Sequence, residues 1–96
     1  MPAIIYALKD DHGKVRYIGK ANNLYARFQG HFRDSGRRKT PVYAWFRKCL
    51  NRGFVPEIEA LETCETDWKE REKFWIAHYR ALGPLLNVAD GGDEPF

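Results

Sequence analysis

Residues 4–20, IIYALKDDHGKVRYIGK, decide how the chain folds. An apolar, β-prone run at Ile4–Leu8 is followed by the turn-forming residues KDDHGK and by a second short run at Val15–Gly19. Two such runs joined by a turn predict a β-hairpin. Because alternate side chains of a strand share a face, Tyr6 and Tyr17 can point to the same side of the sheet.

Beyond the hairpin, the pattern predicts three helices and one further strand. These elements are a helix from a cap at Asn22 or Asn23 to about Asp34, a second helix over Val42–Asn51, a strand over Phe54–Leu61 and a third helix from a cap at Thr66 or Asp67 to about Leu82. The tail from about residue 83, GPLLNVADGGDEPF, is expected to be irregular. Since no repeat or linker interrupts the chain, residues 1–96 are expected to form one domain.

Composition excludes several classes of protein. With 44% hydrophobic and 15% aromatic residues, the chain is not expected to be disordered. It has no apolar run near the ~20 residues of a membrane span and no signal peptide at its start, so a cytoplasmic protein is expected. Cys49 and Cys64 stand apart without a CxxC pair, which predicts reduced thiols instead of a disulfide framework or a four-cysteine zinc site.

The net charge of +3 conceals two unlike halves. Residues 1–52 contain twelve Lys and Arg against three Asp, a balance of +9, whereas residues 53–96 have a balance of −6. This asymmetry is typical of a chain whose first half faces a polyanion such as nucleic acid. Neutralisation of one half by the other across the fold explains the counts equally well.

The first predicted helix carries two polar side chains beside its apolar stripe. Leu24, Phe28 and Phe32 form that stripe, and Arg27 and His31 lie four residues apart on its edge. A guanidinium beside an imidazole can line a cleft and donate hydrogen bonds to a phosphate. The alternative is an Arg27 that lies along the surface and a His31 that only packs.

The third predicted helix places a carboxylate on its apolar face. Its apolar residues are Trp68, Trp75, Ile76, Tyr79 and Leu82, and Glu72 falls within the same arc. A buried carboxylate needs a cation, which can be Arg, Lys or a metal ion. The alternative is a structural ion pair with Arg71 or an arginine of another element. Glu70, Lys73 and Arg80 lie on the opposite face and are expected to be ordinary surface charges.

These residues give the chain a resemblance to the GIY-YIG nucleases. The segments that carry it are Ile4–Tyr6 (IIY), Tyr17–Gly19 (YIG), Lys20–His31 (KANNLYARFQGH), Glu70–Ile76 (EREKFWI) and Leu85–Gly92 (LLNVADGG). Their order and spacing match over essentially the whole chain. The first motif departs from the family by starting with Ile4 instead of Gly, and we expect only a packing adjustment there.

The resemblance implies a fold and an activity. The fold is of the α/β (α+β) class, a small three-stranded antiparallel sheet flanked by about three helices. The activity is hydrolysis of DNA phosphodiesters with one divalent ion, Mg²⁺ or Mn²⁺, one strand at each active site. DNA is the expected partner, in the cytoplasm and at the nucleoid when the protein acts, with no membrane involved. A dimer or a partner protein can provide targeting, in repair or in a mobile element.

The resemblance also assigns roles to individual residues. Glu72 corresponds to the metal ligand, Arg27 to the phosphate-binding catalytic arginine, Tyr6 to the proposed general base, Tyr17 to the residue that orders water or contacts phosphate, Lys20 and His31 to auxiliary catalytic positions, and Gly19 and Asn87 to structural support. Tyrosine has an ordinary pKa of about 10, so a Tyr6 base requires nearby cations such as Lys20 and the metal ion to lower it. His31 is the alternative base.

The loop SGRRKTP joins the first two helices. Arg37, Arg38 and Lys39 within it are predicted to contact the DNA backbone, and a solvated loop is the alternative.

Two other classes of function compete with the nuclease. The first is a non-catalytic nucleic-acid-binding module. The second is a protein-interaction domain with exposed anchors at Tyr43, Trp45 or Phe96.

Overall fold

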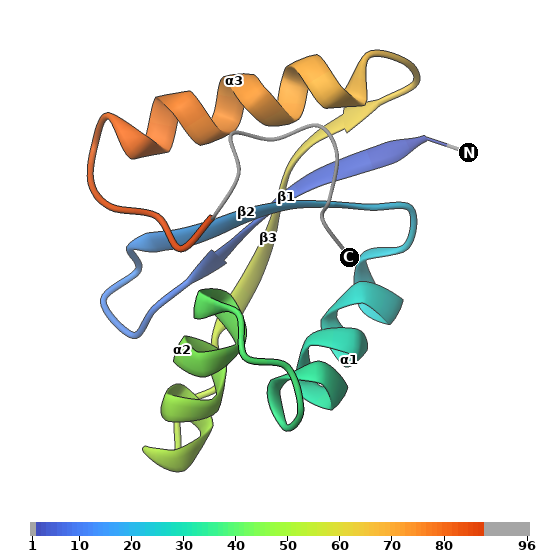
Figure 1. The fold of residues 1–96 in the computed structure, drawn as a ribbon. Coiled ribbons are helices and arrows are strands. Elements are labelled where there is room, and N and C mark those ends of the chain that lie inside the picture. Colours follow the sequence, from blue (N-terminus) through green and yellow to red (C-terminus); the bar gives the residue numbers. More distant parts are fainter. Residues whose placement is uncertain (1, 88–96) are drawn as a thin grey trace.

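The computed structural model describes residues 2–87 as one sheet between helices. The elements are β1 (Ala3–Lys9), β2 (Val15–Ala21), α1 (Leu24–Ser35), α2 (Pro41–Asn51), β3 (Glu57–Cys64) and α3 (Trp68–Arg80). Figure 1 shows α3 on one face of the sheet and α1 and α2 on the other. The predicted three-stranded antiparallel sheet with three helices is therefore confirmed. None of the helices within residues 2–87 is long and apolar enough to cross a membrane.

Strand β1 lies at the centre of the sheet, between β2 and β3. It is antiparallel to β2, with Tyr6 opposite Gly19 and Leu8 opposite Tyr17. Tyr6, Leu8 and Tyr17 belong to the same core cluster, so the two tyrosines share a face as predicted.

The central strand supplies both halves of the core. Tyr6 and Leu8 pack with α1 and α2, while Ile5 and Ala7 pack on the side of α3. All four side chains are fully buried. A strand covered on both faces has no polar side, which explains why its sequence is a continuous apolar run without alternation.

The third strand starts later than predicted. It spans Glu57–Cys64 where the sequence pattern indicated Phe54–Leu61, because Pro56 has no N–H to donate to the sheet and the strand begins after it. Its pairing with β1 shifts between Ile5 and Tyr6, which leaves Leu61 as an extra residue. This bulge interrupts the alternation after Ala60, which lies opposite Tyr6 and is exposed.

Helix boundaries agree at α1 and differ at α3. The Asn23 side chain accepts a hydrogen bond from the N–H of Ala26 at 2.9 Å, which confirms the predicted cap. At α3, Asp67 precedes the helix with φ of +60° and neither it nor Thr66 supplies a capping hydrogen bond. The helix ends at Arg80, and Leu82, predicted on the apolar face, lies beyond it with 71% exposure.

The outer edge of β2 is covered by the segment that follows α3. Leu86 N–H donates to Arg16 O at 2.7 Å. Asn87 accepts from Ile18 N–H through Oδ1 at 3.0 Å and donates to Ile18 O through Nδ2 at 2.7 Å. Residues 83–87 are irregular as predicted, while the predicted irregular residues 88–96 lie outside the described chain. Pairing at this edge satisfies backbone groups that otherwise face solvent.

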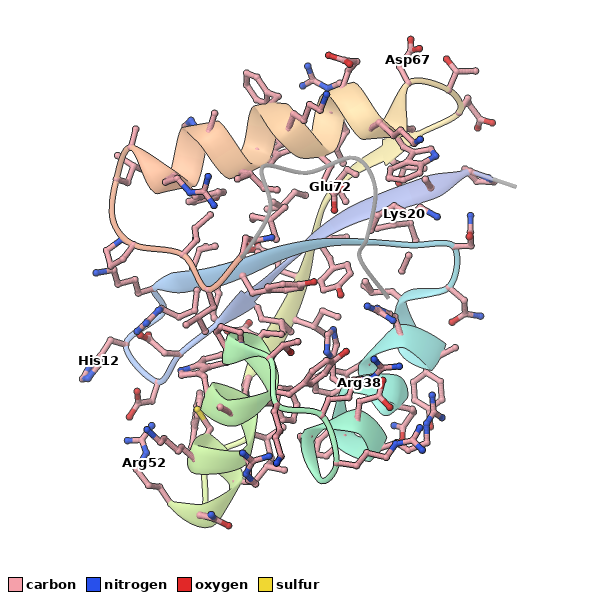
Figure 2. All side chains as sticks on the ribbon, in the orientation of Figure 1. His12, Lys20, Arg38, Arg52, Asp67 and Glu72 are labelled. Atoms are coloured by element: carbon pink, nitrogen blue, oxygen red, sulfur yellow. The ribbon has the colours of Figure 1, made fainter. Side chains whose placement is uncertain are left out.

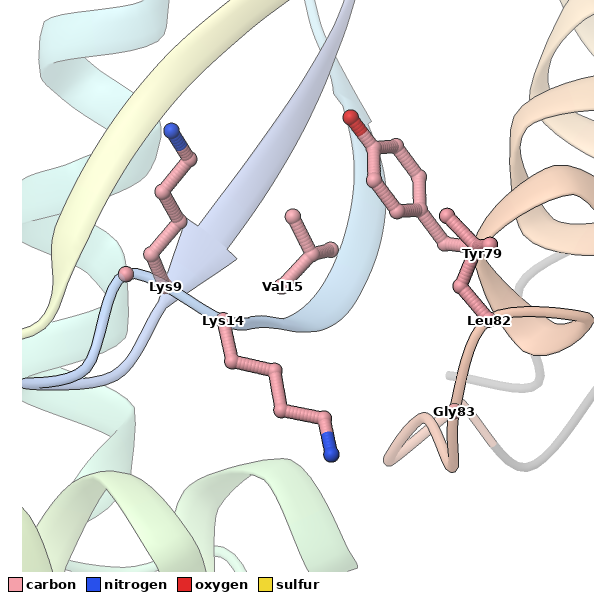
Figure 3. Close-up of a pocket in the computed structure, with 7 residues that line it drawn as sticks. Lys9, Lys14, Val15, Tyr79, Leu82 and Gly83 are labelled. Atoms are coloured by element: carbon pink, nitrogen blue, oxygen red, sulfur yellow. The ribbon is translucent and has the colours of Figure 1, made fainter.

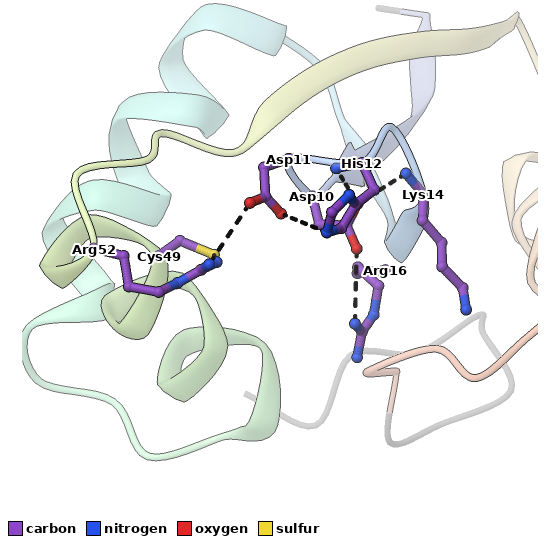
Figure 4. Close-up of polar contacts among 7 residues, drawn as sticks. All are labelled: Asp10, Asp11, His12, Lys14, Arg16, Cys49 and Arg52. Carbon is purple, nitrogen blue, oxygen red and sulfur yellow. Dashed lines mark hydrogen bonds and ion pairs between the residues drawn. The ribbon is translucent and has the colours of Figure 1, made fainter.

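The hairpin turn is tied to the end of α2 (Figure 4). Asp10 Oδ1 accepts hydrogen bonds from the N–H groups of His12 and Lys14, both at 2.9 Å. Burial opposes the charged carboxylate, but these N–H donors hold the pKa of Asp10 below its usual value. Asp11 lies 3.6 Å from Arg52, which follows α2.

The two cysteines do not form a bond. Cys49 and Cys64 are free and buried, as the prediction of reduced thiols requires.

Asn87→Ala tests the covering of β2. The substitution removes both hydrogen bonds to Ile18, so we expect a loss of about 1–3 kcal/mol in the free energy of unfolding, measured by urea denaturation. Asn22→Ala is the control, since it removes one exposed hydrogen bond to Pro2 O and is expected to cost less. Equal losses in the two variants would contradict a special role for Asn87.

Gly19→Ala tests how closely Tyr6 crosses β2. A methyl group at Gly19 would lie 2.5 Å from Cζ and 2.8 Å from Cε2 of the Tyr6 ring, so we expect a loss of about 1–3 kcal/mol in stability. Gly36→Ala is the matched control, because the nearest atom to its methyl group is Arg33 O at 3.9 Å. A Gly19→Ala variant as stable as Gly36→Ala would contradict this packing.

Candidate active site

Three predicted site residues meet at the Tyr6 hydroxyl. Helix α1 starts at its Asn23 cap and places Arg27 and His31 one turn apart, facing the sheet. His31 Nε2 lies 2.7 Å from Tyr6 Oη, and Arg27 Nε donates to the same oxygen at 3.3 Å. Tyr6 and His31 are 0% and 1% exposed, while Arg27 is half-buried. Arg27 is therefore the member of this group that reaches the surface.

Aromatic rings enclose His31. The ring centres of Tyr17, Tyr43 and Phe46 lie 6.0, 5.5 and 5.9 Å from the imidazole centre. Burial and then the positive charge of Arg27 lower the pKa of His31 to about 4, although Asp34 acts in the opposite direction. His31 is consequently neutral at neutral pH, and its Nε2 can accept the Tyr6 proton when Nδ1 carries the ring proton.

Arg27 is held as a cation beside three tyrosines. Burial lowers the pKa of Arg27, but Tyr6, followed by Tyr43 and Tyr17, outweighs burial and raises it above its ordinary value. The cation in contact with the Tyr6 hydroxyl is Arg27, whereas the sequence interpretation named Lys20 and the metal ion as cations near a Tyr6 base.

Lys20 and Glu72 lie on the side of the sheet that α3 covers (Figure 2). Lys20 is opposite Ile5 in the ladder, and its Nζ lies 4.4 Å from the ring centre of Trp68, the first residue of α3. Glu72 is one turn further along α3 and 1% exposed. The candidate site therefore has two parts, one on each side of edge strand β2.

Trp68 contacts a predicted site residue, which the sequence pattern did not suggest. Its position was interpreted only as part of the apolar face of the helix. The sequence feature that could have placed Trp68 near the site is its spacing of four residues from Glu72, which puts both side chains on one side of α3.

Glu72 meets the basic requirements for holding a hard cation. Its Oε2 atom is buried and accepts no hydrogen bond within residues 2–87, although the residue takes part in other interactions. Arg71, the neighbour expected in a structural ion pair, instead donates from Nε to both carboxylate oxygens of Glu62 at 3.0 and 2.9 Å. Among residues 2–87 no three His, Cys, Asp or Glu side chains form a cluster, so an ion at Glu72 would have at most one further ligand of these types from that part of the chain.

The predicted basic loop is organised around a buried acid. Arg37 Nη2 lies 3.1 Å from Asp34 Oδ1, and Arg38 Nε lies 3.6 Å from Asp34 Oδ2. Although burial opposes ionisation, Arg37, Arg38 and Arg33 hold the pKa of Asp34 below its usual range. Two of the three predicted DNA contacts are therefore fixed by an acid that sequence reasoning had left unassigned, while Lys39 is exposed.

A pocket of about 270 Å³ lies away from these residues, at the hairpin turn (Figure 3). Lys9, Lys14, Val15 and Tyr79 are among its lining residues, and none of the predicted site residues is. The hydrogen bond from Lys9 to Glu59, with an Nζ–Oε1 distance of 2.6 Å, raises the pKa of Lys9 against the effect of burial. Lys9 is thus held as a cation by a carboxylate.

The predicted anchors of a protein-interaction domain are not exposed where the structure describes them. Tyr43 is 1% exposed, because it packs in the core beside His31. Trp45 is half-buried against the same cluster. Phe96 lies outside the described residues. The expectation of exposed anchors at Tyr43 and Trp45 was therefore wrong.

Comparison with known proteins agrees with this architecture. The family model "GIY-YIG catalytic domain" matches residues 2–85. The chain is 50% identical over 95 residues to UvrABC system protein C of Thermobifida fusca (strain YX) and 25% identical over 92 residues to that of Arthrobacter sp. (strain FB24). Each match covers 96% of this chain and 13% of the relative, so the chain spans about an eighth of their length.

A solved structure also shares the fold. A Glu-to-Ala mutant of the catalytic domain of intron endonuclease I-TevI superposes with a TM-score of 0.73 and 26% identity, covering 98% of this chain and all of that one. The family model and the shared fold each cover nearly the whole described chain. The chain therefore belongs to the GIY-YIG family of nuclease domains.

Proposed function

We propose that this domain is a divalent-metal-dependent DNA endonuclease that hydrolyses one phosphodiester bond, on one strand, at each active site. The observation that carries the proposal is the hydrogen-bonded group of Tyr6, Arg27 and His31, formed from β1 and α1. A hydroxyl held between a cation and a neutral imidazole is an arrangement suited to moving a proton in a partly dry site. The likeness to UvrABC system protein C supports DNA repair as its setting.

Arg27 is assigned to the scissile phosphate. Its Nε is engaged with Tyr6, which leaves the two Nη groups on the half-buried side chain to turn toward a phosphate oxygen. Guanidinium groups bind phosphate through such parallel N–H donors. Hydrolysis adds negative charge to the phosphate, so a cation already fixed in place stabilises the transition state more than the ground state.

Tyr6 and His31 are assigned to the proton of the attacking water. As water attacks phosphorus, its proton passes to Tyr6 Oη and the Tyr6 hydroxyl proton passes to His31 Nε2. The bond from phosphorus to the leaving oxygen breaks, and the alkoxide that leaves takes a proton from solvent. The two alternative bases thereby become one relay from Tyr6 to His31. Because Tyr6 is fully buried, the relay requires the water to enter beside the half-buried Arg27. Tyr17 lies 6.4 Å from Tyr6 between ring centres and is assigned to ordering the water or the phosphate.

Glu72 is assigned as the metal ligand, and Lys20 as an auxiliary cation beside it. GIY-YIG nucleases are generally dependent on divalent metals. A carboxylate that is 1% exposed is a suitable ligand for Mg²⁺ or Mn²⁺, which would complete its shell with water and phosphate oxygens. A bound ion would withdraw negative charge from the phosphate.

Contacts with the DNA backbone carry no information about base sequence. Arg37, Arg38 and Lys39 are assigned to the sequence-independent DNA backbone. Cleavage of both strands requires two copies or two visits, and targeting is assigned to a dimer contact or a partner protein. Gly19 and Asn87 are assigned to support of the site, since both act on β2.

A cleavage panel tests the activity. With Mg²⁺ or Mn²⁺, the wild type is expected to nick supercoiled plasmid, or to cut flap or junction DNA, and to stop on addition of a chelator. Arg27→Ala is expected to lower the rate by about 10²-fold or more, because a fixed transition-state charge is lost. Glu72→Gln is expected to abolish cleavage at ordinary metal concentrations.

Glu70→Gln is the matched control for Glu72→Gln. It makes the same chemical change on the same helix at an exposed side chain, and it is expected to retain wild-type cleavage. A wild type that binds DNA without nicking any substrate would favour the non-catalytic module. Equal rates for the wild type and Glu72→Gln would exclude the metal-ligand role.

The neutral state of His31 predicts how stability varies with pH. Because its folded-state pKa of about 4 lies below the ordinary value of about 6.5, stability is present above pH 6.5 and is lost as the pH falls toward 4. We expect the wild type to lose about 2 kcal/mol more than His31→Phe between pH 7 and pH 5, measured by urea denaturation. A parallel pH profile for His31→Phe would show that His31 is already protonated or is not buried.

A further inference from the structure

One flank of α3 carries a row of basic side chains. At about 100° per residue, Lys69, Lys73 and Arg80 fall within about 40° of one another around the helix. The sheet-facing Ile76 borders this row, and Glu72 follows on the next part of the helix surface. Sequence analysis had treated Lys73 and Arg80 as ordinary charges on the face away from Glu72, whereas their row adjoins the arc that contains it.

Hydrogen bonds show which edge of the sheet this flank of α3 faces. On the other flank, Arg71 and Trp75 donate hydrogen bonds to Glu62 of β3. The basic row therefore lies on the side of β2, at the opposite edge of the sheet. Two hydrogen bonds connect this flank to β2: Arg80 Nη2 donates to Asn87 O at 3.2 Å, and Asn87 Oδ1 accepts from Ile18 N–H of β2.

At its other end the row meets a candidate catalytic residue. Lys69 Nζ lies 5.7 Å from the Trp68 ring centre, and Lys20 Nζ lies 4.4 Å from the same centre. Trp68 thus has two cations near it, one from the basic row and one from β2. The row runs from the neighbourhood of Lys20 and Glu72 toward the end of α3.

The surface between these side chains is hollow. A groove of about 530 Å³ is lined by Lys73, Ile76, Ala77, Arg80 and Ala81. Cations at its borders and small apolar side chains between them match the chemistry of a nucleic-acid strand, which presents phosphates and sugars in alternation. Lys73 lies 3.9 Å from Glu70, and an exposed pair at that distance holds the lysine only weakly.

Acidic side chains gather at the opposite edge of the molecule. Glu57, Glu59 and Glu62 belong to β3, and Glu65 follows this strand. Within residues 57–80, these acids therefore lie along and just after β3, and the three cations of the row lie toward β2. A polyanion approaching the β2 side meets positive charge from both halves of the chain.

We infer that Lys69, Lys73 and Arg80 form a second contact surface for the DNA backbone, which holds a strand along α3 beside Glu72. The inference rests on the proposed function and extends it, because it places DNA on the α3 side of β2 in addition to the basic loop between α1 and α2. The backbone is contacted without regard to base sequence, so this surface positions DNA and does not select it.

The salt dependence of binding tests this surface. A labelled duplex is titrated with protein at several salt concentrations, without added divalent metal, and log K is plotted against log[salt]. Each phosphate contact contributes about 0.9 to the slope, so Lys73→Ala is expected to lower its magnitude by about 0.9 and Lys69→Ala/Lys73→Ala by nearly 2. Both side chains are exposed, and the variants are expected to keep the thermal midpoint of the wild type.

Lys48→Ala is the matched control. Lys48 is an exposed lysine of α2, on the other side of the sheet, so its removal changes the net charge equally. The inference is upheld when Lys73→Ala lowers the slope and Lys48→Ala does not. It is overturned when the wild type binds with a strong salt dependence and either Lys73→Ala leaves the slope unchanged or both variants lower it equally. A wild type with no salt-dependent binding would overturn the proposed function as well.

Discussion

The hydroxyl of Tyr6 is a polar group in the middle of the most buried strand, and the surrounding structure has to satisfy it. Left without a partner there, it would cost about 1–3 kcal/mol. Arg27 and His31 provide the hydrogen bonds, which requires α1 to lie over β1 at one register. The Tyr6 ring reaches these two side chains by lying across Gly19, where an added Cβ atom would clash with the ring. The contacts that pack α1 against β1 in the core are therefore also the contacts that bring the candidate site residues together.

Strand β2 joins the two parts of the site because it is narrow and lies at an edge. The tyrosines, His31 and Arg27 lie on one side of it, and Lys20 and Glu72 lie on the other. Asn87 covers its outer backbone through two hydrogen bonds with Ile18. The distribution of charge follows the same axis, with acids on β3 and cations toward β2.

Local patterns were sufficient where the relevant residues are near one another in the chain. The hairpin, the Asn23 cap, the spacing of Arg27 and His31 and the inward position of Glu72 all depend on separations of a few residues. The errors arose where a distant contact overrides the pattern. A bulge against β1 displaced the pattern of β3, and packing against His31 buried Tyr43. The predicted roles of the site residues rest on the family resemblance and await experiment.

The amino-acid sequence alone determined the order and type of the helices and strands, because hydrophobic periodicity and helix capping depend on residues only a few positions apart. Tertiary structure decided which charges are paired and which are presented. In the folded chain, Asp34 pairs with Arg37 and Arg38, and Glu62 accepts hydrogen bonds from Arg71. Lys20 Nζ lies over the Trp68 ring. Burial lowers the pKa of His31, so its side chain is neutral. The physical reason is that pairing and protonation depend on burial and on distances of a few ångströms between segments far apart in the chain, which no local pattern encodes.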